Sequence, residues 1–326
     1  MNDPLTRKEQ LMALAQVSDL VKRYSPDGPN AVDGLSFEIG KGELFSLLGP
    51  NGAGKTTAIS VISTLLPPTS GEVVVNGYSV RQNPMAVRGS IGVVPQDLAL
   101  YDDLTGRENL RFWGEMRGLR GAALRGEIEE KLRLTDLTDR AGSRVRTYSG
   151  GMKRRLNLAV GLLGNPPLLL LDEPTVAIDP QSRRYILDWV KDLNRQGVTV
   201  LYTTHNMEEA QELSHRIGII DYGRLIALGT LQELIERVGE RETLVLGLTD
   251  QEGGADLAAA LSGVEGVFHA DADDGQVVLG VRAAQEALPA VLNIASGLGL
   301  SVRTIEIHEP NLEAVFLHLT GRALRD

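Results

Sequence analysis

One glycine-rich segment combines the residue types and the spacing that hold phosphate groups. It reads GPNGAGKTT over residues 49–57 and matches the pattern G-x-x-x-x-G-K-[ST]. Its glycines let successive backbone N–H groups converge on phosphate oxygens, Lys55 supplies a positive charge, and the Thr56 hydroxyl is a ligand for Mg²⁺. The alternative is a glycine-rich turn without a ligand. The residues predicted to hold the phosphates are Gly49, Asn51, Gly52, Gly54, Lys55, Thr56 and Thr57.

Two adjacent carboxylates follow an apolar run in the middle of the chain. Four leucines at 168–171 precede Asp172 and Glu173. An acid at the end of such a strand can hold Mg²⁺ through water, which is the role predicted for Asp172. Glu173 is then placed to accept a proton from an attacking water. Acids at strand ends also cap helices or solvate loops, but a phosphate-binding loop in the same chain favours the catalytic interpretation.

The segments around these residues alternate between strand and helix patterns, which predicts a parallel α/β sheet. Short apolar runs, typical of strands buried on both faces, lie at 44–50, 91–96, 168–174 and 198–205. Helical spacing is found at 56–65, 107–117, 122–134, 152–163, 181–195 and 206–214. Residues 16–42 and 71–80 alternate with turn signals as an antiparallel edge would, so the predicted core is mixed.

The last third of the chain has a different order of elements. Strand patterns lie near 243–248, 265–270, 276–281 and 301–307, and helix patterns near 255–262 and 284–297. This is the βαββαβ arrangement of a small α+β domain. A final amphipathic helix is predicted at 311–321.

Composition separates the two parts and excludes several classes of protein. The 326 residues suffice for about two domains, and the lack of cysteine removes disulfides and thiolate sites. Residues 227–326 hold 16 acidic and 6 basic side chains, whereas residues 1–226 hold 27 of each, so the net charge of −10 belongs to the last third. We predict no nucleic-acid partner, because phosphate backbones need a basic surface. The sequence also has no signal-peptide pattern and no apolar run of membrane-spanning length, so no span of its own is expected.

Several motifs together resemble the ATP-binding cassette (ABC) ATPases. Residues 148–152 read YSGGM and lie between the two motifs above, where that family has its LSGGQ signature. Gln96 resembles the Q-loop glutamine, His205 the switch histidine, and Asp179 the D-loop aspartate. Tyr24 stands where the family stacks an aromatic ring on adenine.

Each of these secondary motifs also has an ordinary interpretation. An aromatic such as Tyr24 is common on edge strands, and Gln96 would serve as a solvated loop amide. A lone histidine is usually structural, and Ser149 at the start of a helix is typical of an N-cap. The cap and a phosphate contact use the same N–H groups, so the two interpretations of Ser149 are compatible.

The resemblance implies a fold and a domain organisation. The expected fold is a P-loop α/β ABC cassette over residues 16–235, with a mixed sheet, an antiparallel β subdomain and a helical subdomain at about 97–160. A polar N-terminal extension at 1–15 and an accessory α+β domain at 243–326 flank the cassette.

The resemblance also implies residue roles. In the family two cassettes face head to tail, so ATP lies between the phosphate loop of one copy and the signature turn of another. Catalysis would fall to Glu173, His205, Gln96 and Lys55. Besides the phosphate loop, ATP would be contacted by Tyr24, Ser149, Gly150, Gly151 and Asp179. Mg²⁺ would be held by Thr56, Gln96 and Asp172.

Departures from the usual motifs point to one branch of the family. Tyr148 and Met152 replace Leu and Gln, and the resulting YSGGMKRR resembles the exporter branch typified by daunorubicin-resistance ATPases. The acidic C-terminal domain and the ending LEAVFLHLTGRALRD resemble the same branch. Ala177 stands where glycine is usual before Asp179; if that position has a positive φ, alanine costs about 1 kcal/mol there.

The predicted function is therefore the ATPase subunit of an exporter. A separate transmembrane permease would dock near Gln96 and the segment 97–125, which would place the homodimer at the cytoplasmic face of a bacterial-like membrane. An importer ATPase shares every cassette motif and stays an alternative. A soluble ABC ATPase acting on DNA or ribosomes is a second alternative, but two cassettes, coiled-coil insertions or basic arms are not visible.

Overall fold

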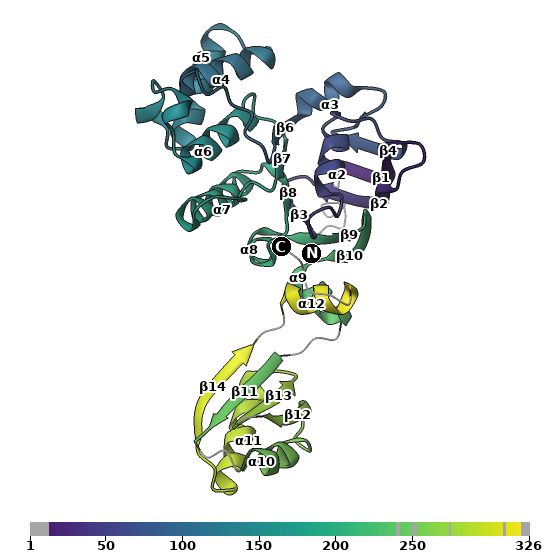
Figure 1. The fold of residues 1–326 in the computed structure, drawn as a ribbon, viewed down its shortest axis with the longest axis vertical. Helices are drawn as coiled ribbons and strands as arrows, with labels where there is room; N and C mark the ends of the chain where they lie inside the picture. The colour runs from purple at the N-terminus through teal and green to yellow at the C-terminus, as the bar shows by residue number, and fades with distance from the viewer. Residues whose placement is uncertain (1–12, 239–241, 250–252, 274, 309–310, 321–326) are drawn as a thin grey trace, which may run out of the picture. The chain divides into compact units, whose positions relative to one another are not determined.

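The computed structural model describes residues 13–238, 242–249, 253–273, 275–308 and 311–320 (Figure 1). The described chain forms two compact units, which divide between Thr230 and Leu231. Most of the predicted polar extension, residues 1–12, lies outside the described residues, and the first strand already begins at Ala13.

The first unit is built on a six-stranded sheet with the strand order β10-β9-β3-β8-β7-β6. The four apolar runs predicted as buried strands are β3 (Leu44–Leu48), β6 (Ile91–Val94), β7 (Leu168–Asp172) and β8 (Thr199–Thr204). They are parallel to one another and to β9 (Arg216–Asp221), whereas β10 (Arg224–Gly229) runs antiparallel to β9. The hairpin of β9 and β10 had no counterpart among the predicted elements.

Every residue of the central strands β3, β7 and β8 is buried because both faces of the sheet are covered. In β7, Leu168 and Leu170 belong to one hydrophobic core, while Leu169 and Leu171 belong to another. The first core includes helix α2 (Lys55–Ile62) and the antiparallel sheet, and the second includes helices α6 (Gly150–Gly161) and α7 (Pro180–Arg195). The prediction of strands buried on both faces is confirmed.

A second sheet of the first unit is antiparallel, as predicted. Its order is β2-β1-β4-β5, with β1 at Ala13–Arg23, β2 at Asn30–Gly40, β4 at Ser70–Val75 and β5 at Tyr78–Ser79. The short helix α3 (Pro84–Ser90), which was not predicted, leads from this sheet to β6.

Three helices between β6 and β7 pack around a hydrophobic core of their own (Figure 1). They are α4 (Gly106–Met116), α5 (Gly121–Leu134) and α6. Helix α4 begins with a capping box, in which the Thr105 side chain accepts from the Glu108 N–H and the Glu108 side chain from the Thr105 N–H. Helix α8 (Met207–Leu213) connects β8 to β9.

The second unit contains the predicted βαββαβ order. Its strands β11 (Glu242–Leu248), β12 (Val267–Asp273), β13 (Gln276–Val281) and β14 (Val302–His308) form an antiparallel sheet in the order β12-β13-β11-β14. Helices α10 (Gly254–Leu261) and α11 (Ala284–Gly297) share a core with this sheet. Helix α12 (Leu312–Thr320) packs against α9 (Leu231–Val238). Of the predicted helix 311–321 and the ending LEAVFLHLTGRALRD, residues 321–326 lie outside the described residues.

Within the described part of the chain, no helix has both the length and the apolar character needed to cross a membrane.

Candidate functional site

The phosphate loop joins β3 to α2, and its glycines are required by the backbone. Gly52 and Gly54 have φ values of 81° and 105°, in the left-handed region that side chains disfavour. At Gly54 a Cβ would also lie 2.4 Å from the Ala31 carbonyl oxygen, and at Gly49 it would lie 2.2 Å from the Ile220 carbonyl oxygen. Any larger residue at these positions would displace the loop.

The Lys55 amine is buried and held by three acceptors. It donates to the carbonyl oxygens of Gly49 at 2.7 Å and Pro50 at 3.0 Å, and it forms an ion pair with Glu173 Oε1 at 2.8 Å. The lysine is 4% exposed and the glutamate 5%. The structure therefore brings together the predicted phosphate-binding cation and the predicted general base.

The second carboxylate lies beside the helix that follows the loop. Asp172 Oδ1 accepts hydrogen bonds from Thr56 Oγ1 at 3.2 Å and from Thr203 Oγ1 at 2.7 Å. Burial raises the pKa of Asp172, and the two hydroxyl donors partly offset this effect by stabilising the carboxylate. Thr56 and Asp172, both predicted as magnesium ligands, are thus in contact.

Glu173 also contacts the predicted switch histidine. Its Oε2 lies 3.1 Å from His205 Nδ1, while its backbone N–H donates to the carbonyl oxygen of Thr203. Glu173 itself has a φ of 45°, so a left-handed backbone carries this carboxylate. Lys55, Glu173 and His205 form one chain of polar contacts, in which Lys55 begins α2 and the other two residues directly follow β7 and β8.

A polar cavity of about 370 Å³ lies beside this chain of contacts. The predicted site residues in its lining are Asn51, Gly52, Gly54, Lys55, Thr56, Thr57, Gln96 and Glu173. Tyr24 does not line the cavity, but its hydroxyl lies 3.1 Å from Thr57 Oγ1 and its side chain is largely exposed. Its ring is therefore available for stacking near the phosphate loop.

The signature turn is not part of this cavity. Ser149 is exposed and is the N-cap of α6, where its side chain accepts from the Met152 N–H at 3.2 Å. Gly150 and Gly151 are the first residues of this helix, and a Cβ on Gly151 would lie 2.2 Å from Ser182 Oγ. None of the predicted signature residues lines the cavity formed by the phosphate loop of the same chain.

Asp179 lies next to the signature turn. It is the N-cap of α7 and accepts from the Ser182 hydroxyl at 2.7 Å and from the Ser182 N–H at 2.9 Å. These bonds lower the pKa of Asp179. Because the Ser182 side chain also approaches Gly151, the two predicted motifs are neighbours within one chain.

Ala177 has a positive φ of 57°. This is the condition under which the sequence analysis expects alanine to be unfavourable at this position. A left-handed alanine costs about 1–2 kcal/mol, and glycine avoids this cost at the expense of a more flexible unfolded chain. We expect Ala177→Gly to raise the free energy of unfolding by about 1 kcal/mol, measured by urea denaturation. Ala123→Gly, in an exposed right-handed turn of α5, is the control and should lower it by about 1 kcal/mol. Equal effects of the two changes would contradict the argument.

The two departures in the signature are packing residues. Tyr148 is buried in the core of α4, α5 and α6, and its hydroxyl donates to the Arg140 carbonyl oxygen at 2.7 Å. Met152 packs against the same core. Both side chains therefore contribute to the hydrophobic core of the helical subdomain.

Sequence reasoning missed several polar residues that fix the site. Thr203 holds both Asp172 and the Glu173 backbone, and Glu209 accepts from Thr204. Arg154, buried at 5% exposure, donates from α6 to the carbonyl oxygen of Gln96 at 2.9 Å. The two threonines directly before His205 were the sequence signal that could have indicated Thr203 and Thr204. Arg154 gave no separate signal, because it lies in a run of three basic residues.

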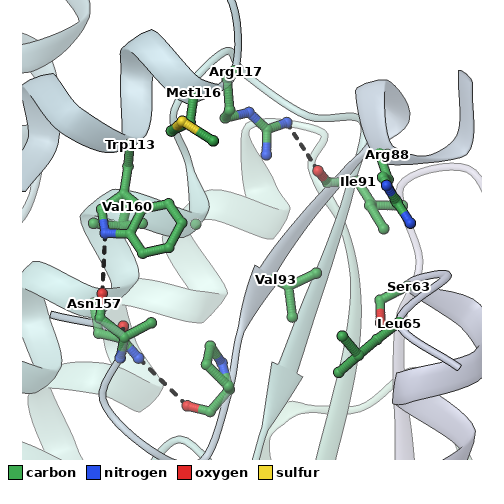
Figure 2. Close-up of a pocket in the computed structure, with 13 residues that line it drawn as sticks. Ser63, Leu65, Arg88, Ile91, Val93, Trp113, Met116, Arg117, Asn157 and Val160 are labelled. Atoms are coloured by element: carbon green, nitrogen blue, oxygen red, sulfur yellow. Dashed lines mark hydrogen bonds between the residues drawn. The ribbon is translucent and has the colours of Figure 1, made fainter. Parts of the chain in front are cut away.

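A second, apolar cavity of about 480 Å³ lies between β6, α4 and α6 (Figure 2). Leu65 and Met116, which are among its lining residues, are 75% and 70% exposed. Polar contacts at its edge join the helices to the segment around Gln96: Trp113 Nε1 donates to the Ala99 carbonyl oxygen, and Asn157 Nδ2 to that of Pro95.

Comparison with known sequences gives matches over nearly the whole chain. The ABC transporter family matches residues 32–176. The linearmycin resistance ATP-binding protein of Bacillus subtilis (strain 168) is 42% identical over 315 residues, covering 96% of this chain and 100% of that protein. The daunorubicin resistance ATP-binding protein of Streptomyces coeruleorubidus is 41% identical over 301 residues, covering 92% and 93%.

Solved structures match about two thirds of this chain. An ATP-binding subunit of an ABC transporter has a TM-score of 0.63 and 31% identity, covering 69% of this chain and 93% of that one. A dimeric bacterial ABC transporter cassette has a TM-score of 0.61 and 29% identity, covering 66% and 98%. A dimeric ATP-binding cassette in a post-hydrolysis state, bound to ADP and Pi, has a TM-score of 0.61 and 28% identity, covering 66% and 98%.

Proposed function

The chain belongs to the ATP-binding subunits of ABC transporters, and from this premise we propose that it is the ATPase of a bacterial exporter for antibiotic or drug-like molecules. The observation that carries the proposal is the contact of Glu173 with both Lys55 and His205 beside the polar cavity. The relatives named for linearmycin and daunorubicin resistance match the C-terminal unit as well as the cassette, which supports an exporter over an importer.

The contacts support a division of labour during hydrolysis. A bound triphosphate would take the place of the Glu173 carboxylate at the Lys55 amine, because both anions compete for the same donor. Glu173 would then accept the proton of the attacking water while it keeps its bond to His205. The second ring nitrogen of His205 would donate to the γ-phosphate.

The proposed magnesium ligands fit the ion chemically. Thr56, Gln96 and Asp172 offer hydroxyl, amide and carboxylate oxygens, which are the hard donors that Mg²⁺ prefers alongside water and phosphate. Bound Mg²⁺ would supply charge neutralisation at the β- and γ-phosphates. The contact of Thr56 with Asp172 places two of these three donors together.

The exposed signature turn supports a composite site formed by two copies. Ser149 and the amides of Gly150 and Gly151 lie at a helix N-terminus, which favours phosphate binding, but they do not line the cavity of their own chain. We therefore place ATP between the Lys55 loop of one copy and the Ser149 turn of its partner. Asp179, beside this turn, would lie in the same interface.

The basic test uses the purified chain. The purified chain should hydrolyse ATP in the presence of Mg²⁺, and hydrolysis should stop when EDTA removes the metal. If the purified chain binds no nucleotide in equilibrium measurements, the proposal is refuted.

The apolar cavity is the proposed docking site for a separate transmembrane permease at the cytoplasmic face of the membrane. It borders the Gln96 segment, so a docked helix could sense the nucleotide site. We expect Met116→Glu to abolish recovery of the chain with membranes that contain its permease, because a charge cannot be buried unpaired, while ATP affinity stays unchanged. Met85→Glu, at an equally exposed methionine outside the lining, is the control. Normal membrane recovery of Met116→Glu would contradict this placement.

A further inference from the structure

Glu209 is a carboxylate that is buried against three hydroxyl groups. It lies in α8, it is 3% exposed, and its Oε2 accepts hydrogen bonds from Thr175, Tyr202 and Thr204, each at 2.9 Å. Several donors are needed there, because a buried carboxylate without partners is strongly destabilising. Burial, and to a smaller extent the negative charge of Glu209, raises the pKa of Tyr202 well above its ordinary value. The Tyr202 hydroxyl therefore stays protonated and can donate its hydrogen bond.

The three hydroxyls come from the two segments that carry the proposed catalytic groups. Tyr202 and Thr204 belong to β8, directly before His205. Thr175 is two residues after Glu173, in the loop that leads to α7. Glu209 therefore ties the end of β8 to the loop that follows β7.

The loop held through Thr175 is strained on both sides. Glu173 has a φ of 45° and Ala177 a φ of 57°. A left-handed backbone is unfavourable for residues with a Cβ and persists only where surrounding contacts impose it. The bond from Thr175 to Glu209 is placed between the two strained residues, where it can impose their conformation.

The other carboxylate oxygen faces the start of α7. Glu209 Oε1 lies 3.6 Å from Arg183 Nε, in the first turn of the helix whose N-cap is Asp179. One buried side chain thus contacts the segment from Glu173 to Asp179 through Thr175, the first turn of α7 through Arg183, and the strand that precedes His205.

We propose that Glu209 is a positioning residue for ATP hydrolysis, which holds the 173–179 loop and the end of β8 in the arrangement that lets Glu173 and His205 meet. Glu209 itself does not touch the nucleotide. This inference rests on the proposed roles of Glu173 and His205, and its tests are chosen so that the two can fail separately.

The first test is Glu209→Gln in the full chain. Its side chain has the same shape but offers the three hydroxyls a neutral group, so the loop is held less firmly. We expect kcat for ATP hydrolysis to fall about 10- to 100-fold, while the affinity for a fluorescent ATP analogue changes less than about twofold. Glu208→Gln, an exposed glutamate in the same turn, is the matched control and should keep its kcat. Thr175→Val removes only one of the three bonds and is the milder variant if Glu209→Gln fails to fold.

A double variant separates positioning from general destabilisation. Glycine adopts the left-handed conformation of residue 177 without strain. Adding Ala177→Gly to Glu209→Gln should therefore raise kcat by a factor at least about three times larger than the factor by which Ala177→Gly alone changes kcat of the unaltered chain.

Two results would overturn the inference. One is an unchanged kcat in both Glu209→Gln and Thr175→Val. The other is a loss of kcat that Ala177→Gly does not relieve. By contrast, normal hydrolysis by Glu173→Gln would refute the proposed role of Glu173 as general base and leave the packing argument for Glu209 intact.

Discussion

Glu173→Gln should lower steady-state ATP hydrolysis at least about 100-fold while the chain still binds ATP. The amide cannot take a proton from water, but it can still accept from the Lys55 amine, which lies 2.8 Å from the carboxylate oxygen. Glutamine has nearly the same size and shape as this buried glutamate, which is 5% exposed, so we expect the loop to keep its fold. Phosphate release gives the rate, and equilibrium binding of a fluorescent ATP analogue gives the affinity.

The same variant should accumulate an ATP-bound dimer, because closure depends on binding and reopening depends on hydrolysis. Size-exclusion chromatography with light scattering would detect the dimer with Mg²⁺ and ATP and a monomer with ADP. Glu208→Gln is the control for removing one carboxylate. Hydrolysis at the unaltered rate by Glu173→Gln would exclude Glu173 as the general base.

Lys55→Ala should weaken ATP binding about 10- to 100-fold, the range expected for losing a charge-assisted contact to phosphate. The change also leaves the buried Glu173 carboxylate without its ion-pair partner, so thermal unfolding must be followed alongside binding. Lys41→Ala removes an exposed lysine and serves as the control. Unchanged ATP affinity in a folded Lys55→Ala chain would contradict the assignment of the phosphate loop.

Much of the fold can be predicted from the sequence, because local residue patterns are enough to identify its central strands. The four leucines of β7 make both faces of this strand apolar. The turn after β3 has glycines at positions where a Cβ would collide with neighbouring backbone. The hairpin β9–β10 and the helix α3 were missed. Helix α3 has only seven residues and begins at Pro84, so it is too short for a helical hydrophobic periodicity to be detected in the sequence.

Only those parts of the site that depend on short sequence motifs could be predicted from the sequence. The roles of Lys55 and Glu173 follow from residue types in short motifs. The contact of Thr203 with Asp172 depends on the parallel register of β7 and β8, which pairs these two residues and which no local pattern specifies. The left-handed backbone of Glu173 and the burial of Glu209 depend on packing in the same way.

The most direct measurement of the composite site mixes two inactive chains, Lys55→Ala and Ser149→Arg. Each homodimer would have both sites broken, since every site needs Lys55 from one copy and Ser149 from the other. A mixed dimer has one intact site, so mixing equal amounts should restore about a quarter of the unaltered ATPase rate, given random pairing into symmetric dimers. If the mixture stays as inactive as its components, or if Ser149→Arg alone hydrolyses ATP at the unaltered rate, the account of a site shared between two copies is wrong.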